Sequence, residues 1–117
     1  MIDFCNAVIK VVKTTGWCKH GLKDNQGRSC LLGCIGRAAG LVTDKTIPGV
    51  NVYNTIRSWI ASNKPLDAAL RAECAVARTC GFDLLDNIIY YNDNKCFSGD
   101  DVIVFMEKVK ARIQNAT

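Results

Sequence analysis

The residues best suited to chemistry are the seven cysteines and the one histidine, His20. Structural zinc takes thiolates and imidazoles, usually in pairs spaced about two to four residues apart. Two short pairs occur, Cys18-x-His20 and Cys30-x-x-x-Cys34, and the second pair would share one face of a helix. A metal site of Cys18, His20, Cys30 and Cys34 is therefore one alternative. In the other interpretation, Cys30 and Cys34 fill core space, His20 faces solvent, and there is no metal or other cofactor.

A cysteine nucleophile is a second possibility at the same place. Such a thiolate needs an adjacent base and a third group that orients the base. Cys18 shortly precedes His20, and the basic residues Lys19 and Lys23 are expected to lower its pKa. However, so short a separation in a loop rarely gives nucleophile–base geometry, and the chain has no second histidine. We therefore expect no catalytic residue.

Basic groups gather before a helix N-terminus expected near Ser29; they are Lys19, His20, Lys23 and Arg28. Helix N-termini and cationic side chains together favour anions, so a small anionic ligand is a further alternative. Neither the phosphate-binding nor the dinucleotide-binding glycine motif is present. The formal net charge of +4 is mild and scattered, so nucleic acid is not an expected partner.

Hydrophobic periodicity predicts the elements that position these residues. Five or six helices and no strong strand are expected, with one long loop at 16–29 after the first helix. Residues 82–91 fit a strand as well as a helix, and the helix is favoured because Asp83 can cap it. The helices are expected at 3–15, 30–41, 51–63, 67–80, 82–91 and from 98 onward, with a turn at 92–95. The expected N-caps are Asp3, Ser29, Asn51, Asp67, Asp83 and Ser98, and the expected stops are Gly16 and Gly81.

Three glycines fall on one stripe of the second predicted helix: Gly33, Gly36 and Gly40. Each costs about 1 kcal/mol relative to alanine inside a helix. The stripe therefore predicts either tight packing between helices or close approach of another backbone or a ligand.

Length and composition predict a single domain spanning residues 1–117. The chain has a mass of 12.8 kDa and is 49% apolar and 22% charged. A fold of this size should bury roughly two-thirds of the surface of the extended chain. We see neither a secretory signal nor a run of about 18 apolar residues, so no membrane contact and a cytoplasmic location are expected. In that compartment most cysteines would be free thiols that fill space in the core.

Two stretches resemble a known family. The first is Gly16-Trp17-Cys18-x-x-Gly21 followed by Asp24-x-x-Gly27-Arg28-x-Cys30-Leu31-x-Gly33, and the second is Tyr91-Asn92-Asp93 before a capped helix. The pattern resembles a small domain of unknown function from actinobacterial proteins and their phages. The chain departs from it at Cys34, where alanine is frequent, and at Tyr91, where tryptophan is frequent. It also lacks the Pro-Gly-Arg expected after Asp93.

The resemblance implies a related fold and, through phage members, an accessory or host-interaction role. Such a role includes inhibiting a host defence by binding a protein or sequestering a signal molecule. At the matching positions, Gly16 and Gly21 would serve backbone geometry and Trp17 would anchor the loop to the core. Arg28 and Asp93 could pair and tie the two motifs together, or both could contact a ligand.

The sequence thus predicts a compact all-α bundle that is a small non-catalytic binding or inhibitory protein. Its partner would be a host protein or a small anionic ligand. Its binding surface would consist of residues 17–28 beside the turn at Asn92-Asp93. The alternatives are a zinc- or thiol-dependent protein, or a small enzyme or sequestering protein for a nucleotide-like anion. The expected binding residues are Trp17, Lys19, His20, Arg28, Asn92 and Asp93.

Overall fold

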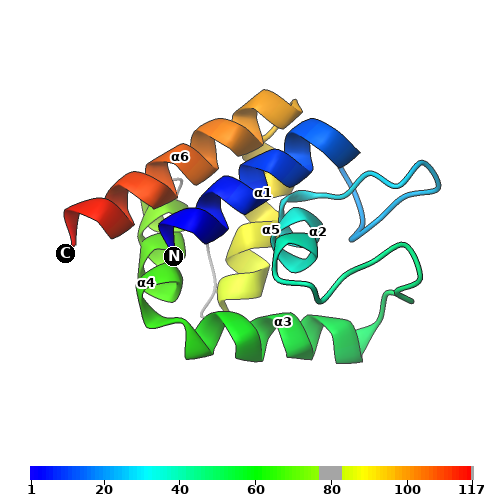
Figure 1. The fold of residues 1–117 in the computed structure, drawn as a ribbon, viewed down its shortest axis with the longest axis horizontal. Coiled ribbons are helices and arrows are strands. Elements are labelled where there is room, and N and C mark those ends of the chain that lie inside the picture. The colour runs from blue at the N-terminus through cyan, green and yellow to red at the C-terminus, as the bar shows by residue number, and fades with distance from the viewer. Residues whose placement is uncertain (77–82, 117) are drawn as a thin grey trace.

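The structure is a computed structural model that describes residues 1–76 and 83–116. These residues form six helices and no strand, which confirms the predicted all-α class (Figure 1). The predicted stop at Cys80-Gly81 and the predicted start at Phe82 lie outside the described residues. No helix in the described part of the chain is long and apolar enough to cross a bilayer. The helices are α1 (Ile2–Thr15), α2 (Leu31–Ala38), α3 (Val50–Ser62), α4 (Lys64–Val76), α5 (Leu84–Lys95) and α6 (Gly99–Asn115).

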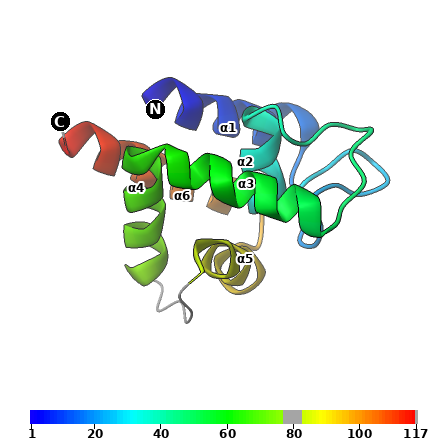
Figure 2. The same cartoon turned by 90° about the horizontal axis from the view of Figure 1, so that it is seen from below.

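The first and last helices form the most extensive helix–helix contact of the fold. They run antiparallel, since the Lys110 ammonium donates to the Asn6 side chain at one end (3.0 Å) and Val12 packs closely against Gly99 at the other. Helices α2, α5 and α4 lie beneath this pair, and α3 closes the opposite side of the molecule (Figures 1 and 2). The buried side chains of these layers form one core around Phe105, which is fully buried.

Both long loops, 16–30 and 39–49, project from the end of the molecule opposite the two chain termini (Figures 1 and 2). The first loop is not structureless. Trp17 and Ser29 form an isolated β-bridge, in which Cys18 N–H donates to the Ser29 carbonyl (3.1 Å) and Ser29 N–H donates to the Gly16 carbonyl (3.3 Å). This bridge returns the chain to the core directly before α2.

Helix α2 begins one residue later than expected. The Cys30 thiol accepts from Gly33 N–H (3.5 Å), so Cys30 and not Ser29 is the N-cap. Ser29 is buried, and its hydroxyl instead accepts from Arg37 Nε (2.7 Å). The helix also ends earlier, at Ala38, because Gly40 adopts a left-handed backbone (φ 76°).

The junction of α3 and α4 differs from the predicted one. Gly49 is the N-cap of α3 in place of Asn51. Helix α4 begins at Lys64, with Pro65 in its first turn, where the missing N–H costs nothing. Asp67 is therefore inside the first turn and is not an N-cap; its carboxylate accepts from Arg71 Nε (3.1 Å).

For α5 the helix prediction is confirmed, and Asp83 caps it by accepting from Leu85 N–H (3.2 Å). The predicted turn at 92–95 is wrong, since the helix continues to Lys95. Asparagine breaks helices when its side chain competes for the local backbone. Here Asn92 is engaged by distant partners, and Asn94 donates back to the Tyr90 carbonyl of the same helix (3.0 Å).

Candidate functional site

Asn92 joins three separate parts of the fold, although it is only 2% exposed. Its side-chain oxygen accepts from the Trp17 indole (2.8 Å) and from Leu31 N–H (2.9 Å). Its amide nitrogen donates to the Lys19 carbonyl (2.6 Å). Leu31 opens α2, so its N–H is one of the donors that a helix leaves unpaired at its start. Asn92 therefore fixes the loop and the start of α2 to the last turn of α5.

Trp17 and Lys19 are held by this arrangement. Trp17 is half-buried and packs against the core, as predicted for an anchor. The Lys19 ammonium donates to the Cys96 carbonyl at the end of α5 (3.1 Å) and lies 4.7 Å from the centre of the Phe97 ring. Both side chains thus brace the loop against α5 and the start of α6.

Four of the six predicted binding residues border one cavity of about 190 Å³, here called the His20 cavity. The His20 Nδ1 atom lies 3.7 Å from the Asp93 carboxylate at its rim. Leu32 and Ile89 give the cavity apolar lining, and Tyr53 contributes from α3. The structure therefore brings the two motif stretches together. The complete lining of the cavity is Lys19, His20, Gly21, Cys30, Leu32, Tyr53, Ile89, Asn92 and Asp93.

Arg28 does not join this group, and the predicted Arg28–Asp93 pair is wrong. Arg28 Nε instead donates to the Asp24 carboxylate (2.7 Å), which also accepts from the backbone N–H groups of Gln26 (2.9 Å) and Arg28 (2.8 Å). Desolvation raises the pKa of Asp24, but these hydrogen bonds outweigh it and hold the pKa below its ordinary value. The Arg28 guanidinium is therefore paired within a local turn that Asp24 closes, while the Asp93 carboxylate faces His20.

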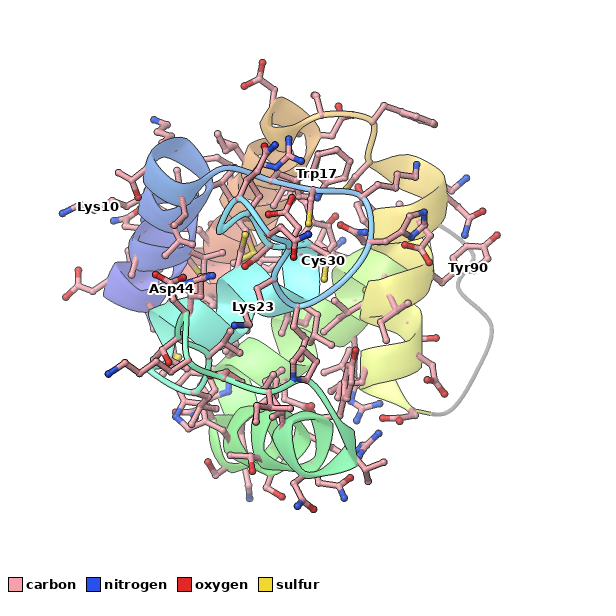
Figure 3. All side chains as sticks on the ribbon, turned by 90° about the vertical axis from the view of Figure 1, so that its right-hand side faces the viewer. Lys10, Trp17, Lys23, Cys30, Asp44 and Tyr90 are labelled. Carbon is pink, nitrogen blue, oxygen red and sulfur yellow. The ribbon has the colours of Figure 1, made fainter. Side chains whose placement is uncertain are left out.

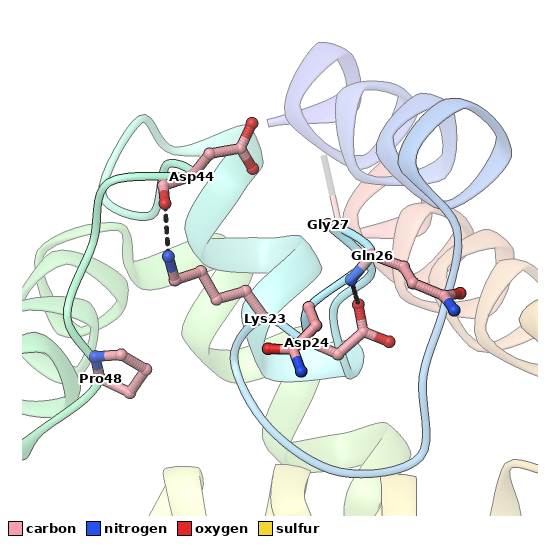
Figure 4. A pocket seen from close by; sticks show the side chains of 7 residues that line it. Lys23, Asp24, Gln26, Gly27, Asp44 and Pro48 are labelled. Carbon is pink, nitrogen blue, oxygen red and sulfur yellow. Dashed lines mark hydrogen bonds between the residues drawn. The ribbon is translucent and has the colours of Figure 1, made fainter.

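A second hollow of about 600 Å³ lies between the two long loops (Figure 4). We call it the interloop recess; it is lined by Lys23, Asp24, Asn25, Gln26, Gly27, Asp44 and Pro48. Lys23 and Asp44 lie on opposite sides of it, at the loop end of the molecule (Figure 3), and the Lys23 ammonium donates to the Asp44 carbonyl.

Arg37 fastens the two loops to α2 and was not singled out from the sequence. Its Nε donates to Ser29, and one of its terminal nitrogens donates to the Gly27 carbonyl (3.1 Å) and to the Asp44 carboxylate (3.1 Å). The side chain is only 10% exposed. A signal was available, because Arg37 is the one charged residue between Cys30 and Leu41.

The glycines of the stripe make room for two different neighbours. A Cβ on Gly33 would lie 2.3 Å from the Leu22 carbonyl oxygen, so the loop backbone packs directly on α2. A Cβ on Gly36 would lie 2.6 Å from a methyl group of Val42 and 3.1 Å from the Ile56 side chain of α3. Close approach of a backbone is therefore confirmed for Gly33 and tight side-chain packing is seen at Gly36, whereas Gly40 lies beyond the helix.

The cysteines that the structure describes are poorly placed for metal binding or catalysis. In residues 1–76 and 83–116, no three His, Cys, Asp or Glu side chains come together in a way that could hold a metal ion, so the set Cys18, His20, Cys30 and Cys34 is not assembled. Burial raises the pKa of Cys30 to about 11 and that of Cys34 to about 12. For Cys18 the predicted lowering is wrong: burial, and then the Asp24 carboxylate, raise its pKa.

The fold and these contacts define a small all-α protein whose first loop is braced against α2 and α5 beside two hollows. A family model described as a family of unknown function (DUF6197) matches residues 2–112, and the chain belongs to this family. No curated protein and no solved structure gives a significant match. The predicted resemblance to a family of unknown function is thus confirmed, while an actinobacterial or phage origin stays a prediction.

Proposed function

We propose that the protein is a non-catalytic binding protein that receives one side chain of a partner protein in the His20 cavity. One observation carries this proposal. Lys19, His20, Asn92 and Asp93 come from two distant stretches of sequence, and they meet around a single hollow.

The size and lining of the cavity favour a single side chain. Pockets for drug-sized ligands have volumes of about 300–1,000 Å³, whereas this one has about 190 Å³. Leu32 and Ile89 provide an apolar interior, and the Asp93 carboxylate lies at the rim. A tyrosine or tryptophan fits this combination, because each has an apolar ring and one hydrogen-bond donor.

The charges of the loop favour a protein partner over an anion. Lys19 is engaged by Cys96, Lys23 by Asp44 and Arg28 by Asp24, so these cations already have acceptors within the chain. The Cys30 thiol at the cavity is protonated near neutral pH, because burial raises its pKa to about 11. Both points favour recognition over thiol chemistry or sequestration of a nucleotide-like anion.

The accessory or inhibitory role toward a host protein belongs to the same proposal and rests on the resemblance. A cytoplasmic location belongs to it as well. The described cysteines are all free thiols, which suits a reducing compartment.

The proposal is tested by titrating the ¹⁵N-labelled full chain with N-acetyl amino-acid amides. The tyrosine and tryptophan derivatives should shift the backbone amides of Gly21, Leu32 and Ile89, and the glutamate derivative should not. Ile89→Trp, which fills the cavity from α5, should abolish these shifts. Val104→Trp, on the exposed side of α6, is the matched control and should retain them. The proposal fails if no derivative shifts these amides, or if Ile89→Trp responds like the unmodified chain.

A further inference from the structure

The interloop recess is separate from the His20 cavity, since the two share no lining residue. With a volume of about 600 Å³, it falls in the range of ligand sites. Two loops form it, and loops on a rigid scaffold are frequent binding elements.

The recess is pre-formed. The Asp24 turn holds one wall, and the contacts of Arg37 with Gly27 and Asp44 tie that wall to the opposite loop. Lys23 adds a further link through its hydrogen bond to the Asp44 carbonyl. Binding to such a site therefore requires little ordering of the loops, which favours affinity.

The hydrogen-bonding groups that remain available in the recess are uncharged. In the described part of the chain, the side-chain amides of Asn25 and Gln26 make no hydrogen bond, and both residues are exposed. Each amide offers one acceptor and two donor hydrogens, the same kinds of group that a peptide backbone presents.

The charged groups at the recess already have partners within the chain. The Asp24 carboxylate is paired with Arg28 and the Asp44 carboxylate with Arg37. Among the described residues that line the recess, the one cation is Lys23, whose ammonium is bonded to the Asp44 carbonyl, so there is no group of free cations such as a phosphate backbone would require. A recess whose charged groups are already engaged suits an uncharged ligand.

The loop opposite these amides gives the recess an apolar edge (Figure 4). Pro48 lines the recess, and the nearby residues Ile47, on the same loop, and Val50, at the start of α3, are 85% and 73% exposed. Exposed large apolar side chains that gather in this way are typical of interaction sites.

We propose that the interloop recess binds an extended, uncharged peptide segment of a partner protein. The side-chain amides of Asn25 and Gln26 pair with the peptide backbone, and an apolar side chain of the peptide packs against Ile47 and Pro48. This contact area is independent of the His20 cavity, so either proposal can fail alone.

A random heptapeptide display library, selected on the biotinylated full chain, tests the proposal. Recovered peptides should carry an apolar residue at a fixed position and no charged consensus. Their affinities, measured by fluorescence anisotropy, should fall by at least about tenfold in Ile47→Ser and in Gln26→Ala. Both side chains are exposed, so both variants should keep the circular dichroism spectrum and melting temperature of the unmodified chain.

Two controls separate this site from the rest of the surface. Val104→Ser removes an exposed apolar side chain from α6, and Ile89→Trp fills the His20 cavity; both should bind the selected peptides normally. The proposal is overturned if the library yields no enriched peptide, if the enriched peptides share an acidic or basic consensus, or if Ile47→Ser binds them unchanged. Loss of binding in Ile89→Trp alone would place the peptides in the His20 cavity and also overturn it.

Discussion

Replacing Asn92 by alanine should be the most damaging polar substitution of the loop end. The change removes one side chain but leaves three partners behind, the indole N–H of Trp17, the N–H of Leu31 and the carbonyl of Lys19. Leu31 is fully buried, so water cannot replace the lost acceptor at the start of α2. Alanine also leaves an empty volume where the carboxamide was.

The expected magnitude follows from counting these groups. An unsatisfied buried donor or acceptor costs about 1–3 kcal/mol. Trp17 and Lys19 are half-buried and can recover part of this cost from water. We therefore expect Asn92→Ala to lower the free energy of unfolding by about 3–5 kcal/mol. For a chain of this length, this corresponds to a fall of roughly 10–20 °C in melting temperature.

Urea unfolding followed by circular dichroism at 222 nm measures the change, and in a Trp59→Phe background the fluorescence of Trp17 reports the loop separately. Asn94→Ala is the matched control: it lies on the same helix and is exposed, and within the described residues its amide bonds only to the Tyr90 carbonyl. Alanine favours helix more than asparagine does, so the control should stay within about 0.5 kcal/mol of the unmodified chain. A loss below about 1 kcal/mol for Asn92→Ala would refute the reasoning, because the loop would then be held without its hydrogen bonds to Asn92.

Three further predictions concern packing, titration and the brace between the loops. Gly33→Ala should cost about 3 kcal/mol of unfolding free energy in urea titrations, because its Cβ would meet the Leu22 carbonyl. Gly49→Ala, with open space around it, should cost no more than about 1 kcal/mol, the difference between glycine and alanine as the N-cap of α3. Burial raises the pKa of Cys34, Cys74 and Cys96 to about 12, so above pH 9 the unfolded state loses thiol protons that the folded state keeps. Unfolding free energy measured under reducing conditions should therefore be level from pH 6 to 8 and fall above pH 9, and a level profile to pH 10.5 would contradict this account. Arg37→Lys removes the planar guanidinium that reaches Gly27 and Asp44, so amide hydrogen exchange at residues 24–28 should accelerate by about tenfold or more. The control Arg57→Lys, whose partners are Asn54 and Asp83, should leave exchange at these residues unchanged.

Much of the helical architecture was predictable from periodicity, because apolar residues three and four positions apart must share a buried face. The last helix is the clearest case, since Val102, Phe105, Met106 and Val109 are all buried. Helix ends were harder to predict. The turn expected at Asn92 fails because asparagine favours turns only while its side chain is free to bond locally, and the three distant partners of Asn92 are 61, 73 and 75 residues away.

The sequence predicted which stretches of the chain form the candidate site, but not which side chains pair with one another there. Residues 19–21 and 92–93 do meet around the His20 cavity, as the two-motif pattern suggested. The pairing of Arg28 with Asp93 was one of two alternatives, and neither anticipated that Asp24 binds the guanidinium four residues away. Arg37 went unnoticed because a charged residue on a short apolar helix is ordinarily a solvent-facing one, and only the folded loops supply its acceptors.

The pairing of α1 with α6 makes the first helix depend on the last one during synthesis. The apolar face of α1, with Cys5, Val8 and Val12, is completed only when residues 99–115 are available. At about 5–20 residues per second, a ribosome needs roughly 5–20 s to add the roughly 100 residues from the end of α1 to the end of α6. The nascent α1 therefore stays without its main partner until residues 99–115 have been made. A chain that terminates before α6 should be a substrate for chaperones and proteases instead of a smaller folded protein.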